Sequence, residues 1–238
     1  MNTEALKDLL FRLADDDLVI GHRNSEWTGF GPALEEDIAF ASMAQDCVGH
    51  AQSYYTLIHE LGEADPDRLA FHRSEQDFRS CHLVEQPIGD YAFSLIRHLL
   101  YDLAKQVRLE ALMQSSYVPL AQLADRIRRE HKYARLHAIT WVKQLASGSD
   151  EARLRLQSAL NEAYPMALGL FEATDYTESL AADGIQPTES ELQARWQQLL
   201  EQALAGTGLN LPTGFDPASF LGGRKGYHSE HLEPMLAE

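Results

Sequence analysis

Apolar residues recur every three or four positions along nearly the whole chain, and short alternating runs bounded by turn residues are rare. This spacing lines up apolar side chains on one face of a helix, and such a face must pack against other helices. With 45% hydrophobic residues among 238, the chain has ample material for a packed core. The pattern therefore predicts an all-α protein.

Turn residues divide this helical pattern into long helices and connections. Gly21 is expected to end the first helix, Pro32 to begin the second and Gly62 to follow it, while Pro165 should kink the fifth. The predicted helices lie at about 4–21, 32–61, 88–115, 119–146, 150–172 and 188–205, the last with a capping box formed by Thr188 and Glu191.

Weak periodicity between Pro66 and Pro87 predicts a long crossover between two tightly connected helix pairs. That connectivity is typical of ferritin-like bundles. We therefore expect an all-α, ferritin-like four-helix bundle with a long crossover, additional C-terminal helices and an extended tail. One domain should cover 1–238, with the bundle at about 4–147, further helices at about 150–205 and a Gly- and Pro-rich arm at 206–238 that lies along the bundle or reaches a partner.

Four acidic residues, one on each predicted bundle helix, are spaced alike in the two helix pairs. Asp16 and Asp46 are 30 positions apart, and Asp102 and Glu130 are 28 apart. Di-iron carboxylate bundles carry an acid on each of two helices and a Glu-x-x-His pair on the other two. The two histidine slots, three residues after Asp46 and Glu130, hold Gly49 and Tyr133. The pattern indicates degenerate ligand positions, with no catalytic residue and no confident metal ligand.

Each acid also has a plainer explanation. Asp16 belongs to a run of three aspartates that suits a solvated helix edge, and Asp46 lies one position outside the apolar seam of its helix. Asp102 is better placed, because it continues an apolar stripe, and a carboxylate buried there needs a metal, a cation or hydrogen-bond donors. Glu130 can pair with a neighbouring arginine.

Two histidines lie near the missing slots without occupying them. His50 is displaced by one residue and His131 by two. Because each residue turns a helix by ~100°, neither should replace a lost ligand without backbone distortion. Both are expected to be core or interface histidines.

The net charge and the number of cysteines argue against a nucleic-acid-binding protein and against a disulfide-rich protein. The chain has 20 basic and 36 acidic residues, a formal charge of −16 and no run of Lys or Arg, which argues against nucleic-acid binding. Cys47 and Cys81 are too few for a disulfide framework. No long apolar stretch or signal peptide is found, so we expect a soluble, cytoplasmic protein that does not bind membranes.

Several motifs together indicate a family. GHR-x-SEW followed by P-x-LEEDIA occurs within 13–52, DYAFSLIRHLLYDLAKQVRLEAL covers 90–112, RREHKYARLH lies in the predicted fourth helix, and GRKGYHSEHL lies near the C-terminus. Along almost its whole length the chain resembles the C-subunit family of the ring-1,2-phenylacetyl-CoA epoxidases, the multicomponent monooxygenases of aerobic phenylacetate degradation. One local departure is Ala134, where family members often carry His.

The resemblance implies a non-catalytic structural subunit with the same fold as its catalytic A subunit and with degraded ligand positions. The di-iron centre and the substrate would belong to the A subunit, and NADPH would be used by a separate reductase. This chain would hold no cofactor, would be inactive alone, and would stabilise the A subunit within a hetero-oligomer that includes further subunits.

The loop at 22–31 is the candidate contact surface for that partner, together with the second and third helices. Arg23 and Glu26 offer charge there, and Trp27 and Phe30 offer aromatic area. The loop could instead simply cover the end of the bundle. Two other functions also stay open: a catalytically competent ferritin-like di-iron oxygenase or oxidase with a carboxylate-rich site, and a helical adaptor that shares only the fold.

Overall fold

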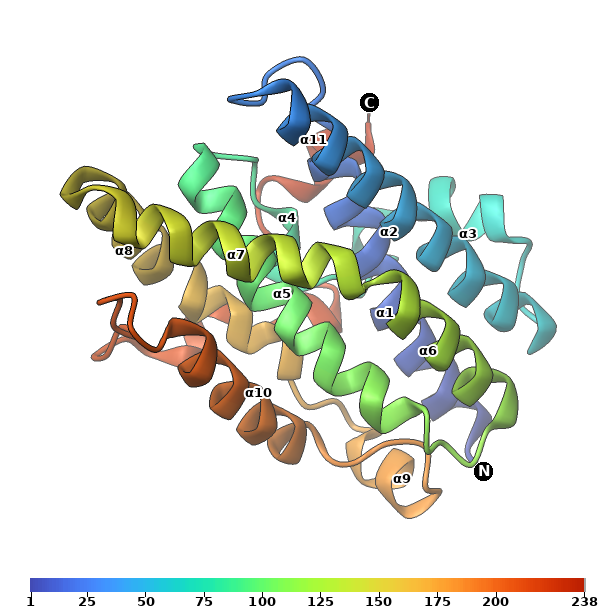
Figure 1. Cartoon of the computed structure of the whole chain (residues 1–238). Coiled ribbons are helices and arrows are strands. Elements are labelled where there is room, and N and C mark those ends of the chain that lie inside the picture. The colour runs from blue at the N-terminus through green and yellow to red at the C-terminus, as the bar shows by residue number, and fades with distance from the viewer. Residues whose placement is uncertain (238) are drawn as a thin grey trace.

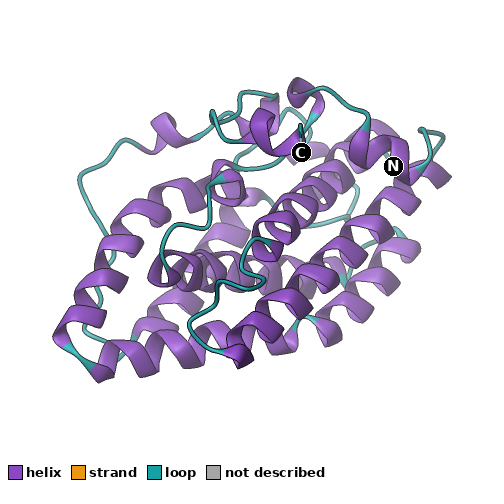
Figure 2. Cartoon of the chain, turned by 90° about the horizontal axis from the view of Figure 1, so that it is seen from above, coloured by secondary structure: helices purple, strands orange, loops and turns teal. Residues whose placement is uncertain are grey.

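The computed structural model describes residues 1–237, and every regular element in that range is a helix (Figures 1 and 2). The long helices are α1 (Thr3–Ser25), α2 (Leu34–Glu60), α5 (Tyr91–Leu112), α6 (Val118–Glu130), α7 (Lys132–Gly148), α8 (Asp150–Ala167) and α10 (Glu189–Leu204). The shorter ones are α3 (Pro66–Phe71), α4 (His82–Glu85), α9 (Thr177–Ala182) and α11 (Leu232–Leu236), with 3-10 turns η1 (Glu75–Asp77), η2 (Leu168–Phe171), η3 (Pro217–Phe220) and η4 (Gly223–Lys225). The all-α prediction is confirmed.

Helix α5 is the central element of the bundle. It packs against α6, α7, α8 and α10, while α1 packs along α2 (Figure 1). The segment predicted as a long crossover carries α3, η1 and α4 between α2 and α5. Most residues of α5 are buried, which leaves this helix little surface for a partner.

Helix α1 continues through Gly21 to Ser25, so the predicted end at Gly21 is wrong. A Cβ atom at Gly21 would lie 3.1 Å from both the Cβ atom of Cys47 and the Cγ2 atom of Val48. The glycine therefore permits close approach of α1 to α2 rather than ending the helix. Composition alone does not distinguish these two uses of glycine.

The helix predicted at 119–146 is divided at His131. Helix α6 ends at Glu130 and α7 begins at Lys132, and the two follow one another along the bundle (Figure 1). His131, at the junction, keeps helical backbone angles, and its imidazole lies 3.3 Å from Asp102 Oδ1.

Two later helices differ in how well the sequence defines their ends. The capping box of α10 is confirmed: Thr188 Oγ1 accepts from the Glu191 backbone N–H at 3.4 Å, and Glu191 Oε2 accepts from the Thr188 N–H at 2.9 Å. Helix α8 includes Pro165 and ends at Ala167. The remainder of the predicted fifth helix is the 3-10 turn η2.

A buried ion cluster joins α1, α5 and α10. Glu189 accepts from Arg12 at 2.9 Å and from Arg108 at 2.7 Å, and Gln186 Nε2 donates to the same carboxylate at 2.9 Å. Burial alone would raise the pKa of Glu189, but the two guanidinium groups outweigh it and lower that pKa to about 2. The carboxylate is thus an ionised link between three helices.

The C-terminal arm lies on the bundle over its described residues. Arg224 binds Asp16 of α1, His228 Nδ1 lies 2.7 Å from Glu85 Oε1, and the Ser229 N–H donates to Glu85 Oε2 at 2.8 Å. At these residues the arm lies along the bundle.

Glu189→Gln should lower the free energy of unfolding by about 3–5 kcal/mol at pH 7, because two arginines lose their buried counter-ion. A depressed carboxyl pKa stabilises the fold above the unfolded value of 4.5, and that stability is lost as pH falls toward about 2. Denaturant unfolding of both forms at several pH values should therefore show a difference that shrinks over this window. Glu201→Gln, at an exposed position of α10, is the control and should change stability little.

Candidate functional site

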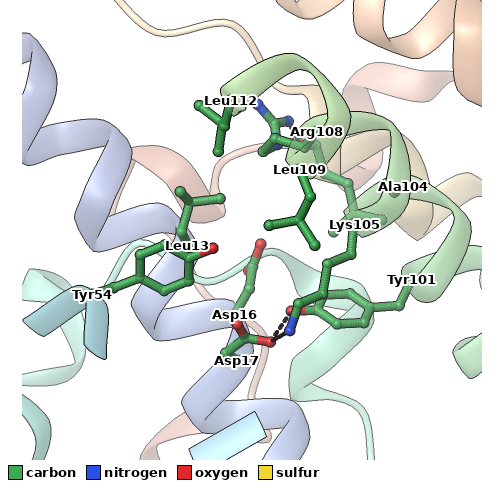
Figure 3. Close-up of a pocket in the computed structure, with 11 residues that line it drawn as sticks. Leu13, Asp16, Asp17, Tyr54, Tyr101, Ala104, Lys105, Arg108, Leu109 and Leu112 are labelled. Atoms are coloured by element: carbon green, nitrogen blue, oxygen red, sulfur yellow. Dashed lines mark hydrogen bonds and ion pairs between the residues drawn. The ribbon is translucent and has the colours of Figure 1, made fainter. Parts of the chain in front are cut away.

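The side chain of Lys105, on α5, ends at the centre of the four-helix bundle. Its ammonium forms an ion pair with Asp17 Oδ1 on α1, and Tyr101 donates a hydrogen bond to the same oxygen at 2.7 Å. Figure 3 shows Lys105 extending past Tyr101 to reach Asp17. The ammonium also donates to His50 Nδ1 on α2 at 3.1 Å. One cation therefore bridges three helices of the bundle.

The electrostatics keep this lysine charged. Burial lowers the pKa of Lys105, but the Asp17 carboxylate outweighs it, so the net pKa is raised. Burial and then the Lys105 charge lower the pKa of His50 to about 2. His50 is thus a neutral imidazole that accepts at Nδ1 from Lys105 and donates at Nε2 to Glu130 Oε2 at 3.1 Å.

Asp102 lies one helical turn before Lys105 and is held by histidines. Its Oδ2 is 3.2 Å from His98 Nδ1, and its Oδ1 is 3.3 Å from His131 Nε2. His98 Nε2 in turn lies 2.8 Å from Asn24 Oδ1 on α1. Burial raises the pKa of Asp102, but the charge and hydrogen bond of His98 outweigh this and lower it. Asp102 is therefore a buried carboxylate with neighbours on both oxygens.

A small cavity of about 30 Å³ lies beside this centre (Figure 3). Leucines such as Leu109 and Leu112 form much of its apolar lining. The polar lining comes from Asp16, Asp17, Tyr54, Tyr101, Lys105 and Arg108. Such a volume suits one or two water molecules and excludes an organic substrate.

Asp16 lines the same cavity but binds the C-terminal arm rather than Lys105. Its oxygens accept from the Arg224 guanidinium at 2.7 and 2.9 Å, and Oδ1 also accepts from the Cys81 backbone N–H at 2.9 Å. Its neighbour Asp15 pairs with Arg73 and accepts from the Tyr55 hydroxyl at 2.5 Å. The aspartate run is buried rather than a solvated edge, and each member has its own partner.

The other predicted positions lie apart. Asp46 is exposed and has a pKa raised first by partial burial and then by the Glu130 charge, while Gly49 and Tyr133 face solvent. Glu130 pairs with His50 rather than with an arginine of its own helix. Of the four predicted acids, the bundle centre thus includes Asp102 and, at its edge, Glu130 and Asp46.

Three residues of this centre were missed by sequence reasoning: Asp17, His98 and Lys105. A signal was available, because Lys105 follows Asp102 by three positions and so shares its inward helix face. No feature of the sequence indicates that Asp17 rather than Asp16 pairs with Lys105, because both belong to one run of aspartates.

As arranged, these donors do not fit a pair of iron ions. Lys105 carries its positive charge into the space between Asp17 and His50, and it uses the lone pair of His50 Nδ1 that a metal would need. Within residues 1–237 no three His, Cys, Asp or Glu side chains are grouped to hold a metal ion.

The loop proposed as a partner surface is mostly used within the chain. Arg23 is buried, donates to the Glu85 carbonyl at 2.8 and 3.0 Å, and pairs with Glu26 at 2.6 Å. Trp27 is also buried and donates through Nε1 to Ser94 Oγ at 2.9 Å. Phe30, in contrast, is 78% exposed. Of the four candidates, Phe30 offers the most surface, with Glu26 partly accessible.

Comparison with known proteins adds three findings. A family model described as phenylacetic acid catabolic protein matches residues 1–238. The C subunit of the 1,2-phenylacetyl-CoA epoxidase of Escherichia coli (strain K12) is 35% identical over 228 residues, which cover 95% of this chain and 91% of that protein. A Synechococcus protein with aldehyde deformylating oxidase activity superposes with a TM-score of 0.63 at 16% identity, covering 88% of this chain and 95% of the other. The predicted ferritin-like fold is confirmed.

No helix within the described part of the chain is both long enough and apolar enough to span a membrane.

Arg224→Met should leave Asp16 as a buried carboxylate without its guanidinium partner. We expect the free energy of unfolding to fall by about 3–5 kcal/mol. We also expect trypsin to cleave at the adjacent exposed Lys225 at least tenfold faster, because Arg224 fastens the arm to α1. Arg195→Met removes an exposed arginine from α10 and should change neither quantity. Equal cleavage rates in both variants would contradict this role of Arg224.

Proposed function

The chain belongs to the family of phenylacetic acid catabolic proteins, and on this premise we propose that it is the non-catalytic C subunit of a 1,2-phenylacetyl-CoA epoxidase. It binds a di-iron catalytic A subunit and holds it in its active shape. The complex acts on the CoA-activated aromatic ring, and a separate reductase supplies electrons from NADPH. The chain itself contributes no cofactor and acts in the cytoplasm.

The position of Lys105 is the observation that carries the proposal. A catalytic ferritin-like bundle needs open coordination positions at its centre, where oxygen and substrate can approach the metal. Here a buried ammonium, held by Asp17 and His50, lies between the helices. The adjoining cavity of about 30 Å³ is too small for an aromatic thioester. Both features favour a supporting role over catalysis.

Exposed apolar side chains at the start of α2 supply a surface for the partner. Phe30 is 78% exposed, Leu34 71% and Ile38 61%. Leu34 and Ile38 are four residues apart and share one helix face. Large exposed apolar side chains on neighbouring turns are typical of protein interfaces.

Helix α7 contacts the face of α2 that carries Glu36, opposite Leu34 and Ile38, and has exposed apolar residues of its own. His137 Nε2 is 2.8 Å from Glu36 Oε2, which fixes α7 against the first turns of α2. Tyr133 and Leu136 of α7 are 54% and 47% exposed. We propose that the A subunit binds over the exposed face at the start of α2, with Phe30 at the edge of the contact.

The first experiment compares the chain purified alone with the chain co-purified with its A subunit, after anaerobic ferrous loading. Both samples receive reductase, NADPH and phenylacetyl-CoA. We expect bound iron and ring epoxidation only in the sample that contains the A subunit. About two irons per chain in the isolated protein, or epoxidation by it, would instead support the alternative of a competent di-iron oxygenase or oxidase.

Leu34→Asp and Ile38→Asp test the contact surface. Each introduces a charge into the proposed apolar interface, so affinity for the A subunit should fall at least tenfold, about 1.4 kcal/mol. Leu154→Asp is the matched control, because Leu154 is 68% exposed on α8, and its affinity should stay within twofold of the unaltered chain. Calorimetric titration measures all three. Equal losses in all three variants, or none, would argue against this surface.

A further inference from the structure

We propose that the Lys105 ammonium replaces a metal ion as the central cation of this bundle, and that removing it opens a site for one divalent transition-metal ion. The ligands would be the Asp17 carboxylate, the His50 imidazole and the Asp46 carboxylate. This inference concerns the isolated chain and does not depend on the proposed partner.

The ligand geometry around Lys105 supports the first step. Its ammonium is in contact with one carboxylate oxygen, from Asp17, and one imidazole nitrogen, Nδ1 of His50 at 3.1 Å. These are the two donor types that transition-metal ions such as Co²⁺ and Zn²⁺ take from proteins. Asp17 Oδ1 and His50 Nδ1 both face the Lys105 ammonium, so both are already oriented to bind a metal ion at that position.

A third donor is available on the same helix as His50. Asp46 precedes His50 by four residues, and side chains at that spacing lie on neighbouring turns of one helix face, as in helical metal-binding pairs. Asp46 is close enough for its carboxyl group to interact electrostatically with Lys105. Asp46 is exposed in the intact chain, so the proposal requires its side chain to turn inward once the ammonium has gone, and the Asp46→Asn variant below tests that step.

The charge balance supplies the driving force. Asp17 and Asp102 are both buried, and Lys105 is the cation that Asp17 contacts directly. Without the lysine, Asp17 keeps only the Tyr101 hydroxyl as a hydrogen-bond donor, and a buried carboxylate in that state is costly. A divalent ion restores the lost charge, and the space vacated by the lysine side chain joins the cavity of about 30 Å³ beside it.

The hydrogen bonds of His50 explain why Lys105 and a metal ion cannot both bind it. The neutral His50 ring donates through Nε2 to Glu130 and accepts through Nδ1 from Lys105. A metal-bound histidine has this same arrangement, with one nitrogen on the cation and the other N–H held by a carboxylate. Only one cation can use the Nδ1 lone pair, so the unaltered chain should bind transition metals weakly.

The test is Co²⁺ binding by Lys105→Ala, measured by equilibrium dialysis and by visible absorption of the bound ion. We expect about one Co²⁺ per chain, at least tenfold tighter binding than in the unaltered protein, and a rise in melting temperature that Mg²⁺ does not produce. Adding His50→Ala or Asp46→Asn to Lys105→Ala should weaken Co²⁺ binding at least tenfold. Lys143→Ala, at an exposed position of α7, is the control and should behave as the unaltered chain.

Two results would overturn the proposal: a folded Lys105→Ala variant that binds Co²⁺ no tighter than the unaltered chain, or tight binding that His50→Ala does not reduce. If Lys105→Ala does not fold in metal-free buffer, refolding with and without Co²⁺ replaces the dialysis. Recovery of helical circular dichroism with Co²⁺ but not with Mg²⁺ supports the proposal. Failure to recover with Co²⁺ contradicts it.

Discussion

The ion pair between Lys105 and Asp17 is the interaction on which the bundle centre depends. It joins α1 to α5, and its second contact, with His50, brings in α2 and through Glu130 the end of α6. Removing one member of a buried pair leaves an uncompensated charge, which costs far more than the intact pair contributes. These contacts fix how the four helices lie against one another. If one helix shifted along its axis, Lys105, Asp17 or His50 would lose a buried partner.

The same principle recurs at two further places where distant segments meet. Glu189 links α10 to Arg12 of α1 and Arg108 of α5, and Asp16 links α1 to Arg224 of the C-terminal arm. Apolar packing supplies most of the stabilisation in a protein of this size but is not directional. Buried pairs with defined geometry instead select which helices and which residues meet, so α1, which takes part in all three, positions the rest of the chain.

The position of Lys105 and the exposed apolar residues both bear on the function of this chain, which belongs to a family of phenylacetic acid catabolic proteins. In the proposed supporting role, a bundle centre occupied by Lys105 needs no access for oxygen or substrate. Its exposed apolar residues lie instead on the outside, at the start of α2 and along α7. In this chain the ferritin-like fold therefore combines a centre occupied by Lys105 with exposed apolar side chains on the outside, which is consistent with the proposed supporting role.

Much of this architecture follows from the sequence by itself, because helical periodicity, proline positions and a capping box such as Thr188–Glu191 are local properties of the chain. The inward position of Asp102 could also be predicted from the sequence, because Asp102 continues an apolar stripe of its helix. Only the tertiary structure decided that Gly21 is a helix contact, that Asp17 rather than Asp16 binds Lys105, and that His131 approaches Asp102. Which residue on a helix face finds a partner depends on the side chains that other helices bring to that face, and local spacing does not encode those long-range contacts.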